Sequence, residues 1–241
     1  MKHFFITGTS RGIGKALAET LLANDNVKVT GISRTNTIKH PNYNHIQTDL
    51  SDPADTESIF FPDLHDAEEI VLINNSAIIS EILRLGKIKN TSIKNDFQVN
   101  IISPSLLMNN FIKKYQSYTN RRTILNVSSG AGLHAIDAWS VYCASKSALN
   151  MISESFAVEQ SFQAVENQIK VFSVAPGVID TKMQDQIRAV SSADFSDVDK
   201  FIQMKENNAL SSPEETAASL LKIISERDQY KEVVLDVRNL K

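Results

Sequence analysis

Short apolar runs that alternate with segments of helical periodicity are the feature that most restricts how this chain can fold. Seven strand-like runs recur, most of them apolar throughout, at 3–7, 27–33, 44–48, 69–75, 122–129, 169–176 and 232–237. Helical periodicity fills the gaps at 13–24, 96–116, 140–163 and 213–226, and less clearly at 54–64. Strands buried on both faces are typical of parallel sheets covered by helices. The pattern predicts a doubly wound α/β fold with a predominantly parallel, seven-stranded sheet and helices on both faces.

The 241-residue chain is long enough to bury a large core, and no repeat, low-complexity tract or Pro/Gly-rich linker divides it. We therefore expect one domain over residues 1–241. The stretch from Thr181 to Leu210 is polar and lacks a strand-like run. Segments of this kind inside a compact domain are often functional, so 181–210 is predicted to form a substrate lid.

Composition restricts the partners and the compartment. The net charge of −3 and the pI of about 6.0 do not favour binding to nucleic acid or to an anionic membrane. Cys143 is the single cysteine, which suits a reducing compartment, and the apolar run at the N-terminus ends at Ile6, too early for a signal peptide. We expect a cytoplasmic protein without a membrane span. The five histidines show no metal-ligand spacing, so no metal is expected.

A glycine-rich stretch, TGTSRGIG, joins the first predicted strand to the first predicted helix. Its glycines are Gly8, Gly12 and Gly14. A helix N-terminus at such a turn can hold a phosphate group. The spacing is not G-x-G-x-x-G, and a P-loop is excluded because Thr9 and Ala16 stand where it needs Gly and Ser or Thr. By itself the stretch fits either a nucleotide site or a tight packing turn.

The second predicted strand favours the nucleotide site. It ends in GISRTN, with Ser33 and Arg34 where NAD-binding units carry an acid, and Arg11 lies within the glycine stretch. Two guanidinium groups could bind a 2′-phosphate, so NADP(H) is the expected cofactor. Alternatively, both arginines are solvated surface residues.

The region 122–146 carries the candidate reactive groups. Ser129 ends a predicted strand, Tyr142 follows thirteen residues later, and Lys146 lies one helical turn beyond the tyrosine. Each fragment alone is usually a turn or an amphipathic pair, and Ser128 is the neighbouring alternative for the serine. His134 and Asp137 suggest a hydrolase triad, but the G-x-S-x-G elbow is missing.

In combination these motifs resemble the short-chain dehydrogenase/reductase family over essentially the whole chain. The resemblance rests on TGxxxGxG, on Asn74-Asn75, on Ser129, on YxxxK and on Pro176-Gly177. It implies a Rossmann fold in which Tyr142 is the general acid and Ser129 binds the substrate oxygen. It further implies that Lys146 lowers the pKa of Tyr142 and binds the nicotinamide ribose, and that Asn100 joins a proton relay.

The resemblance also implies a set of cofactor-binding positions. They are Gly8, Ser10, Arg11, Gly12, Ile13, Gly14, Ser33, Arg34, Asp49, Leu50, Asn75, Tyr142, Lys146, Pro176, Gly177, Val178 and Thr181. The family's NNAG motif reads NNSA here, with Ala77 in place of glycine. Trp139 and Met183 are the candidate walls of the substrate pocket, beside Ser129 and Tyr142.

Residues 176–215 are most similar to the family members that reduce benzil or sepiapterin. The predicted activity is NADPH-dependent reduction of one ketone of a vicinal diketone to a chiral hydroxyketone. Alternatives are a sepiapterin-type reductase, a 3-oxoacyl reductase or alcohol dehydrogenase, and a non-enzymatic NADP sensor, which the complete set of catalytic residues disfavours. Family relatives further imply a homodimer, or a tetramer, built through 96–116 and 140–163.

Overall fold

One sheet of seven parallel strands runs through the centre of the protein, in a computed structural model that describes residues 1–240. The strand order is β3-β2-β1-β4-β5-β6-β7, and every neighbouring pair is parallel. The predicted fold class is thereby confirmed. The strands are β1 (Lys2–Thr7), β2 (Val27–Ser33), β3 (Tyr43–Gln47), β4 (Glu69–Asn74), β5 (Arg121–Val127), β6 (Lys170–Ala175) and β7 (Val234–Asp236).

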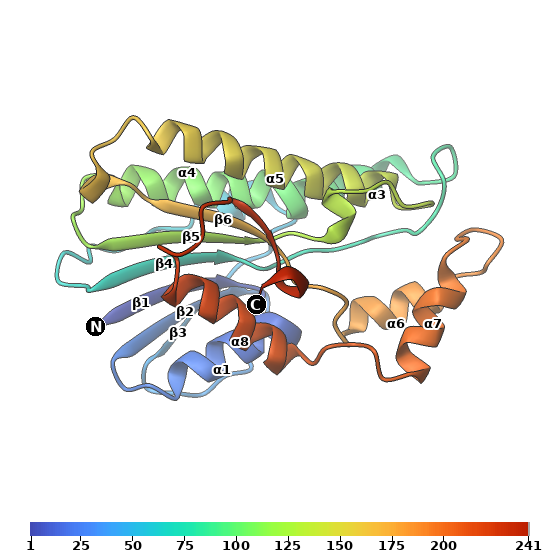
Figure 1. The fold of residues 1–241 in the computed structure, drawn as a ribbon, viewed down its shortest axis with the longest axis horizontal. Coiled ribbons are helices and arrows are strands. Elements are labelled where there is room, and N and C mark those ends of the chain that lie inside the picture. The colour runs from blue at the N-terminus through green and yellow to red at the C-terminus, as the bar shows by residue number, and fades with distance from the viewer. Residues whose placement is uncertain (241) are drawn as a thin grey trace.

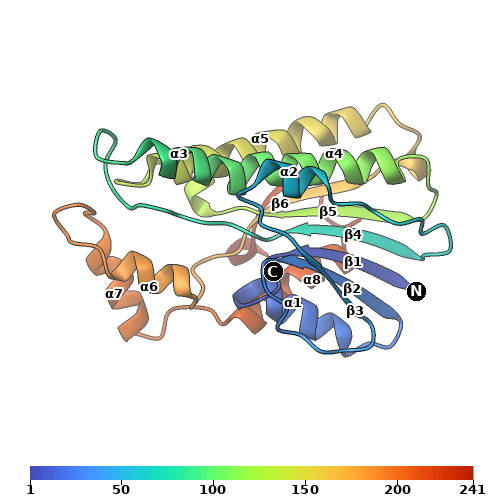
Figure 2. The same ribbon diagram turned by 180° about the vertical axis from the view of Figure 1, so that it is seen from behind.

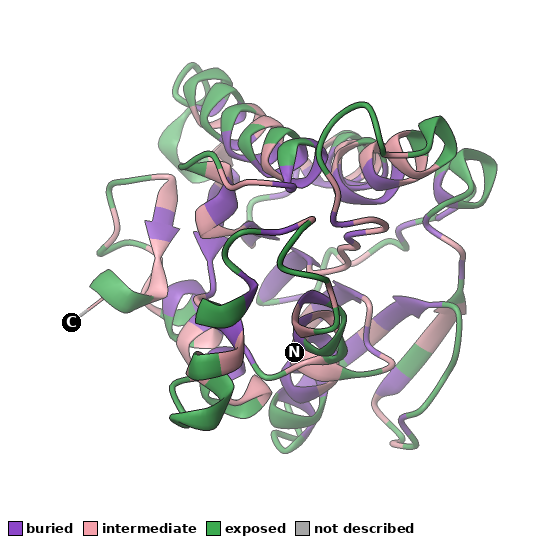
Figure 3. Cartoon of the chain, turned by 90° about the vertical axis from the view of Figure 1, so that its right-hand side faces the viewer, coloured by how far each residue is buried: buried purple, intermediate pink, exposed green. Residues whose placement is uncertain are grey.

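Helices cover both faces of this sheet (Figures 1 and 2). The helices α1 (Gly12–Leu22) and α8 (Pro213–Ser225) pack on one face, where Phe4 and Ile6 of β1 point. The helices α4 (Ser103–Tyr115) and α5 (Ser140–Gln160) pack on the other face, where Phe5 points. Figure 3 shows the buried residues concentrated in the strands and on the inner faces of the helices.

The chain changes direction across the sheet at β1. The connections from β1 to β2 and β3 run towards one edge, and β4 follows on the opposite side of β1. In open α/β sheets such a switch point leaves a crevice at the carboxyl ends of the strands. Two helices, α6 (Lys182–Arg188) and α7 (Val198–Glu206), project beyond that end (Figure 1).

The helix expected at 54–64 is much shorter in the structure. Asp52 and Pro53 open it as predicted, with the Asp52 carboxylate accepting from the Ala54 N–H at 2.8 Å, but α2 ends at Glu57. Ile59 and Phe61 are buried although they lie beyond the helix. Because these buried apolar residues are spaced as on a helix, the irregular segment 58–64 shows helical periodicity in the sequence. Pro62 prevents this segment from continuing α2 as a helix.

The helix expected at 96–116 begins earlier and is interrupted. It starts as α3 (Asn90–Phe97), passes through a π-turn at Gln98–Ile102, and continues as α4. The predicted lid, 181–210, forms α6, α7 and the turns between them. The helix expected at 213–226 opens with a capping box between Ser212 and Glu215, at the Ser-Pro-Glu-Glu signal.

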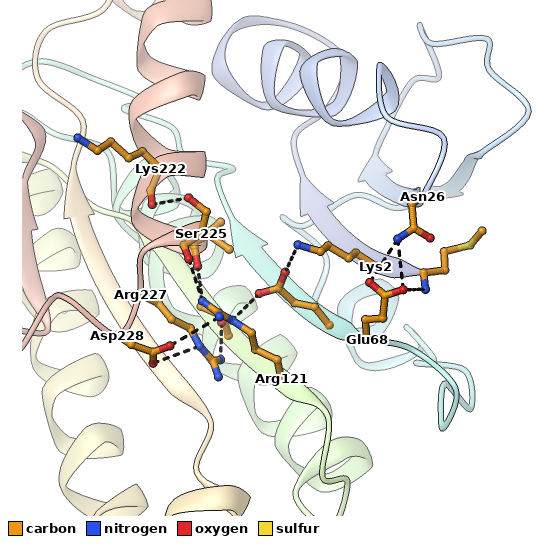
Figure 4. A network of polar contacts seen from close by, with 12 residues as sticks. Lys2, Asn26, Glu68, Arg121, Lys222, Ser225, Arg227 and Asp228 are labelled. Carbon is orange, nitrogen blue, oxygen red and sulfur yellow. Dashed lines mark hydrogen bonds and ion pairs between the residues drawn. The ribbon is translucent and has the colours of Figure 1, made fainter.

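A network of ion pairs ties together the amino ends of the strands, opposite the crevice (Figure 4). The buried Glu69 carboxylate lies 3.3 Å from the Lys2 Nζ and 3.0 Å from the Arg121 Nε. The N-terminal ammonium lies 2.8 Å from Glu68, and the Arg121 guanidinium donates to the Ser225 carbonyl at 3.0 Å. These contacts connect β1, β4, β5 and the end of α8 at the amino ends of the strands.

Two kinds of feature are absent from residues 1–240. No helix there has both the length and the apolar character needed to cross a membrane. No group of three or more His, Cys, Asp or Glu side chains in that range is placed to hold a metal ion.

Candidate active site

A continuous cavity of about 1120 Å³ occupies the crevice at the carboxyl ends of the strands. Its volume exceeds the roughly 300–1,000 Å³ of a typical small-ligand site. Nearly all the predicted site residues line it, from the glycine turn at one end to the lid at the other. They are Gly8, Ser10, Arg11, Gly12, Ile13, Ser33, Arg34, Asp49, Leu50, Asn75, Ser129, Trp139, Tyr142, Lys146, Pro176, Gly177, Val178, Thr181 and Met183.

Two glycines of the turn, Gly12 and Gly14, are required for different structural reasons. Gly12 has φ of +56°, a left-handed conformation that favours glycine. A Cβ on Gly14 would lie 2.4 Å from the Gly8 carbonyl oxygen and 2.5 Å from the Asn75 Nδ2. The Asn75 amide donates to the Thr7 carbonyl at 2.9 Å and fills this space. Gly14 therefore does not line the cavity: it permits close packing between α1, β1 and the loop after β4.

The loop after β4 tolerates alanine at the position where the family has glycine. Ala77 lines the cavity but does not have a positive φ, so its Cβ causes no backbone strain. Asn74 turns away into the core, where its amide donates to the Asn126 side chain at 2.8 Å.

One end of the cavity presents two arginines. Arg11 and Arg34 are exposed and have no ion-pair partner within 4 Å among residues 1–240. Asp49 also lines this end, but its carboxylate accepts from the N–H and the hydroxyl of Ser51 at 3.0 and 2.7 Å, which lowers its pKa. Leu50 is buried behind it. This end therefore carries two guanidinium groups and one carboxylate, and its net charge is positive.

A hydroxyl network beneath the arginines escaped the sequence analysis. The Tyr43 and Thr9 hydroxyls lie 2.8 Å apart, and Ser33 Oγ lies 3.1 Å from the His45 ring nitrogen Nε2. Gly31 gives this network room, because a Cβ there would lie 2.0 Å from the Tyr43 hydroxyl. The one glycine inside β2, Gly31, was the only available signal.

Ser129, Tyr142 and Lys146 meet at the other end of the cavity. Ser129 follows β5, and the first two turns of α5 supply Tyr142 and Lys146 on one face. Ser129 Oγ accepts from the Ala131 N–H at 3.1 Å, which leaves its own proton free to donate. The Lys146 Nζ donates to the Val127 carbonyl at 2.8 Å and lies 5.8 Å from the centre of the Tyr142 ring.

Burial controls the proton affinities of this pair. Desolvation raises the pKa of Tyr142 to about 12, against a smaller lowering effect from its hydrogen bond with Ser129. Desolvation also lowers the pKa of Lys146 to about 7. Lys146 is not among the groups that shift the pKa of Tyr142 in the protein alone. The lowering of that pKa by Lys146 stays a prediction.

Asn100 lies behind the cavity wall rather than in it. It sits in the π-turn, where its side chain accepts from the Ile78 N–H at 2.9 Å and donates to the Ile78 carbonyl at 2.8 Å. Its amide also donates to Ser145 Oγ at 3.2 Å. π-turns inside helices are frequent at functional sites. The structure shows no direct contact between Asn100 and Lys146, so the relay role stays a prediction.

The two alternatives raised by the sequence have other contacts. The Ser128 hydroxyl donates to the buried Asn150 side chain at 2.6 Å. Asp137 is held by Arg84 through two bonds of 2.9 Å, and His134 is exposed. Since Asp137 faces Arg84 rather than His134, no Ser-His-Asp triad forms.

An aromatic cluster from the lid encloses the substrate end of the cavity. The Trp139 ring stacks on Phe195 at 5.6 Å, packs against Phe201 at 5.5 Å and meets the Tyr142 ring edge-on at 5.6 Å. Met183 packs beside this cluster. Positions that the sequence did not indicate also line the cavity here, and they are Ile78, Ile79, Ser80, Gln184, Gln186, Phe201, Met204 and Arg238.

The residues present fit a dinucleotide. The first N–H groups of α1 have no partner within the helix, and they border the cavity beside two free guanidinium groups. Lys146 is 1% exposed, and its ammonium has three donors but a single protein acceptor. A ligand with phosphate groups near Arg11 and Arg34 and hydroxyl oxygens near Lys146 would satisfy these groups.

Comparison with known proteins gives a consistent result. A family profile described as short chain dehydrogenase matches residues 2–191. Benzil reductase ((S)-benzoin forming) of Bacillus subtilis (strain 168) is 34% identical over 230 residues, which are 93% of each chain. The enzyme of the same name from Bacillus cereus is 32% identical over 237 residues, covering 93% of this chain and 94% of that protein.

A solved structure shares the fold. The structure of 4-hydroxyisoleucine dehydrogenase complexed with NADH superposes with a TM-score of 0.81 over 98% of this chain and 96% of that chain, at 23% identity. The family profile matches most of the chain, and both benzil reductases are more than 30% identical to it. The chain belongs to the short-chain dehydrogenase family and is an oxidoreductase that acts on CH–OH and C=O groups.

Proposed function

We propose that this protein reduces one carbonyl of a vicinal diketone such as benzil, with NADPH as the electron donor, to give a hydroxyketone. The observation that carries the proposal is the single cavity that joins two free arginines to Ser129, Tyr142 and Lys146. The likeness to two benzil reductases supports the substrate class. The aromatic lid around Trp139 suits a substrate with apolar substituents.

The charge at the nucleotide end supports NADPH over NADH. Dinucleotide units that bind NAD place an acid at the end of the second strand, where it accepts from the ribose 2′-hydroxyl. Here β2 ends in Ser33 and is followed by Arg34, and Arg11 faces the same space. A 2′-phosphate would give both guanidinium groups a partner.

Tyr142 acts in this proposal as the acid of the reaction. The reduced nicotinamide, when bound, supplies the hydride. Ser129 donates its free hydroxyl proton to the substrate oxygen, and Tyr142 donates its phenolic proton to that oxygen as it becomes an alkoxide. Because burial raises the pKa of Tyr142, the phenol is protonated at neutral pH, as an acid must be.

Lys146 orients the cofactor and connects the site to a proton supply. Two of its three donors remain available for the hydroxyl groups of a ribose. Asn100 holds the Ile78 backbone on the far side, and one water between Asn100 and Lys146 would complete a path for the proton that replaces that of Tyr142.

The first experiment is turnover by the purified protein, followed by the loss of NADPH absorbance. Benzil, sepiapterin and an acetoacetyl thioester are compared under identical conditions. We expect benzil to be reduced fastest, and Tyr142→Phe to lose at least about 100-fold in kcat while it still binds NADPH. Binding of NADPH without turnover of any of the three substrates would contradict the proposal and favour a sensor.

The cofactor preference is tested by binding. Arg34→Asp should weaken NADPH by about 10- to 100-fold, since a charge-assisted hydrogen bond contributes about 1.5–3 kcal/mol, and should change NADH little. Dissociation constants from nicotinamide fluorescence measure both. Arg238→Asp, at the other end of the cavity, is the matched control. An equal loss for both cofactors in Arg34→Asp would overturn the assignment.

A further inference from the structure

Two polar side chains in the wall of the cavity have buried atoms without a hydrogen-bond partner. These atoms are the Trp139 indole nitrogen Nε1 and the Gln184 side-chain oxygen Oε1. Trp139 is 6% exposed and Gln184 is 8% exposed. The other unpartnered buried side-chain atoms of residues 1–240 belong to residues that do not line the cavity. Because buried polar groups normally have partners, this pair indicates that a ligand supplies them.

Both side chains lie at the end of the cavity where the substrate is proposed to bind. Trp139 directly precedes α5, and the centre of its ring lies 5.6 Å from that of the Tyr142 ring. Gln184 lies on the inner face of α6, where Ile187 is the other buried residue. Ile187 belongs to the same apolar cluster as Trp139 and Tyr142. The two unpaired groups therefore approach the substrate end from the start of α5 and from the lid.

The chemistry of the two groups suits a carbonyl oxygen. An indole N–H only donates a hydrogen bond, so its partner must be an acceptor. The Gln184 amide carries one acceptor and two donors, and rotation about its last side-chain torsion exchanges their places. Its oxygen has no partner to lose by this rotation. A ligand oxygen can therefore accept from both residues.

A vicinal diketone brings such an oxygen close to the carbonyl that reacts. Its two carbonyl carbons are joined by one C–C bond of about 1.5 Å, so the second oxygen stays near the first. Ser129 and Tyr142 take the oxygen of the carbonyl that is reduced in the reaction proposed above. The second oxygen needs donors of its own, because an unpaired carbonyl among apolar side chains is destabilised.

We propose that Gln184 and the indole N–H of Trp139 bind the carbonyl that is not reduced, and that they thereby select vicinal diketones over simple ketones. The proposal rests on the proposed function, because it assigns a substrate contact of that reaction. Binding requires the Gln184 amide to turn, and the Phe195 and Phe201 rings that pack on Trp139 to shift around the substrate. The same contacts hold the hydroxyketone product, which keeps the second carbonyl.

The substrate pair benzil and deoxybenzoin tests this selection. Deoxybenzoin has a methylene group in place of one carbonyl of benzil and keeps both phenyl rings. We expect Gln184→Met to lower kcat/KM for benzil by about 10-fold and to change that for deoxybenzoin by less than about 2-fold. Comparing each variant with the wild type on both compounds cancels the higher intrinsic reactivity of benzil. If deoxybenzoin is not reduced, its inhibition constant against benzil takes the place of kcat/KM.

Gln186→Met is the matched control on the same helix. The Gln186 amide also lines the cavity, but it already donates to the Ile79 carbonyl at 2.7 Å. Its loss should affect both compounds by the same factor. Gln184→Glu keeps the shape of the side chain and replaces its donors by a carboxylate, so the selective loss should recur there if Gln184→Met does not fold. An equal loss on both compounds in the Gln184 variants, or a selective loss in Gln186→Met, would overturn the proposal.

The single tryptophan of the chain provides a readout without turnover. Its indole N–H gives one signal in a ¹H–¹⁵N spectrum, and a new hydrogen bond to a carbonyl moves that signal downfield. In the complex with NADP⁺, which has no hydride to give, benzil should move the signal further downfield than deoxybenzoin does. Equal shifts would refute the subsite even if benzil is reduced. A selective shift without any turnover would support the subsite and contradict only the proposed function.

Discussion

At the scale of single residues, the site combines groups whose preferred charge is neutral. Tyr142 and Lys146 are both buried at the cavity wall, and burial moves the pKa of each towards its uncharged form. Such a pair is stable as a neutral phenol beside an amine close to its titration point. A ligand that brings oxygen atoms or negative charge to Lys146 would favour its charged form. Without such a ligand, burial of the ammonium group destabilises the folded protein.

The unfavourable burial of the Lys146 charge leads to a prediction for Lys146→Met. The pKa of Lys146 falls from 10.5 to about 7 on folding, so between these values the unfolded chain binds the extra proton. Stability contributed at this position therefore rises with pH from 7 to 10.5 and is lowest below 7. Methionine removes this dependence. We expect Lys146→Met to be more stable by about 1–3 kcal/mol at pH 7, after allowing for the unpaired Val127 carbonyl.

Thermal unfolding at pH 7 and at pH 10 measures the effect. The gain in Lys146→Met should shrink at the higher pH, and turnover should be lost at both. A variant that is less stable than the wild type at pH 7 would show that Lys146 stays charged and well solvated in the folded protein.

Ser128 and Ser129 have different surroundings, so we expect different effects when each is replaced by alanine. Ser129→Ala should lower kcat by about 100-fold with little change in stability, because its hydroxyl faces the cavity and bonds only to the Ala131 N–H and to Tyr142 of the site itself. Ser128→Ala should keep kcat and lose about 1–2 kcal/mol, because its hydroxyl satisfies the buried Asn150. Steady-state kinetics and urea unfolding on both variants check this. Exchanged phenotypes would assign the catalytic role to Ser128.

The sequence predicts which residues line the cavity, but it does not predict most of the contacts that these residues make. Spacing places Tyr142 and Lys146 on one helical face and Ser129 at a strand end. It gives no access to pKa values or to the network of Thr9, Tyr43 and His45, because these depend on residues far apart in the chain. It also gives no sign that Asp96 is buried, because that burial depends on the loop at Ser80, which bonds to the carboxylate.

At the scale of elements, strands were predicted well and irregular segments poorly. Buried parallel strands leave a continuous apolar run, which the sequence displays directly. The segment 54–64 imitates a helix because Ile59 and Phe61 reach the core from a loop. The π-turn before α4 has no marker in the sequence, since it is stabilised by Asn100 bonding to a loop twenty-two residues earlier.

The attachment of the lid gives a third prediction. Arg84, in the loop before α3, donates two bonds to Asp137 and one of 3.2 Å to the Ala193 carbonyl, while Asp137 accepts from the Ser196 N–H at 3.1 Å. The guanidinium holds the pKa of Asp137 well below its usual value, so this clamp persists at mildly acidic pH. Arg84→Ala should release the lid and raise KM for the diketone by about 3- to 10-fold, with a smaller change in kcat.

Kinetics and hydrogen exchange over 190–197 test the clamp together. Arg84→Lys should be intermediate, because an ammonium cannot make the paired contact with Asp137. Lys222→Ala breaks an exposed ion pair on α8, away from the lid, and serves as the control. If the control raises KM as much as Arg84→Ala does, the effect is not due to the lid.

At the scale of the whole molecule, the two ends of the sheet differ in structure: one end is joined by ion pairs, and the other end carries the cavity. The amino ends of the strands are joined by the charged network of Glu69, Arg121 and their neighbours (Figure 4). The carboxyl ends carry the cavity, its left-handed glycines and its free arginines. Because contacts at the amino ends hold the strands in place, the loops at the carboxyl ends are available to bind ligands.

The outer face of α5 gives the last prediction, which concerns assembly. Met151 and Val158 lie seven residues apart on one face and are each 61% exposed, and Ile102, just before α4, is 45% exposed. Apolar side chains gathered on neighbouring elements favour an interface with a second copy of the chain. We expect a homodimer through this face, and Met151→Glu with Val158→Glu should yield monomers, because charges buried at such a contact would be unpaired. Sedimentation velocity measures the state. Leu85→Glu, which changes another exposed apolar residue outside these helices, should remain dimeric, whereas a wild type that sediments as a monomer at micromolar concentration would contradict the prediction.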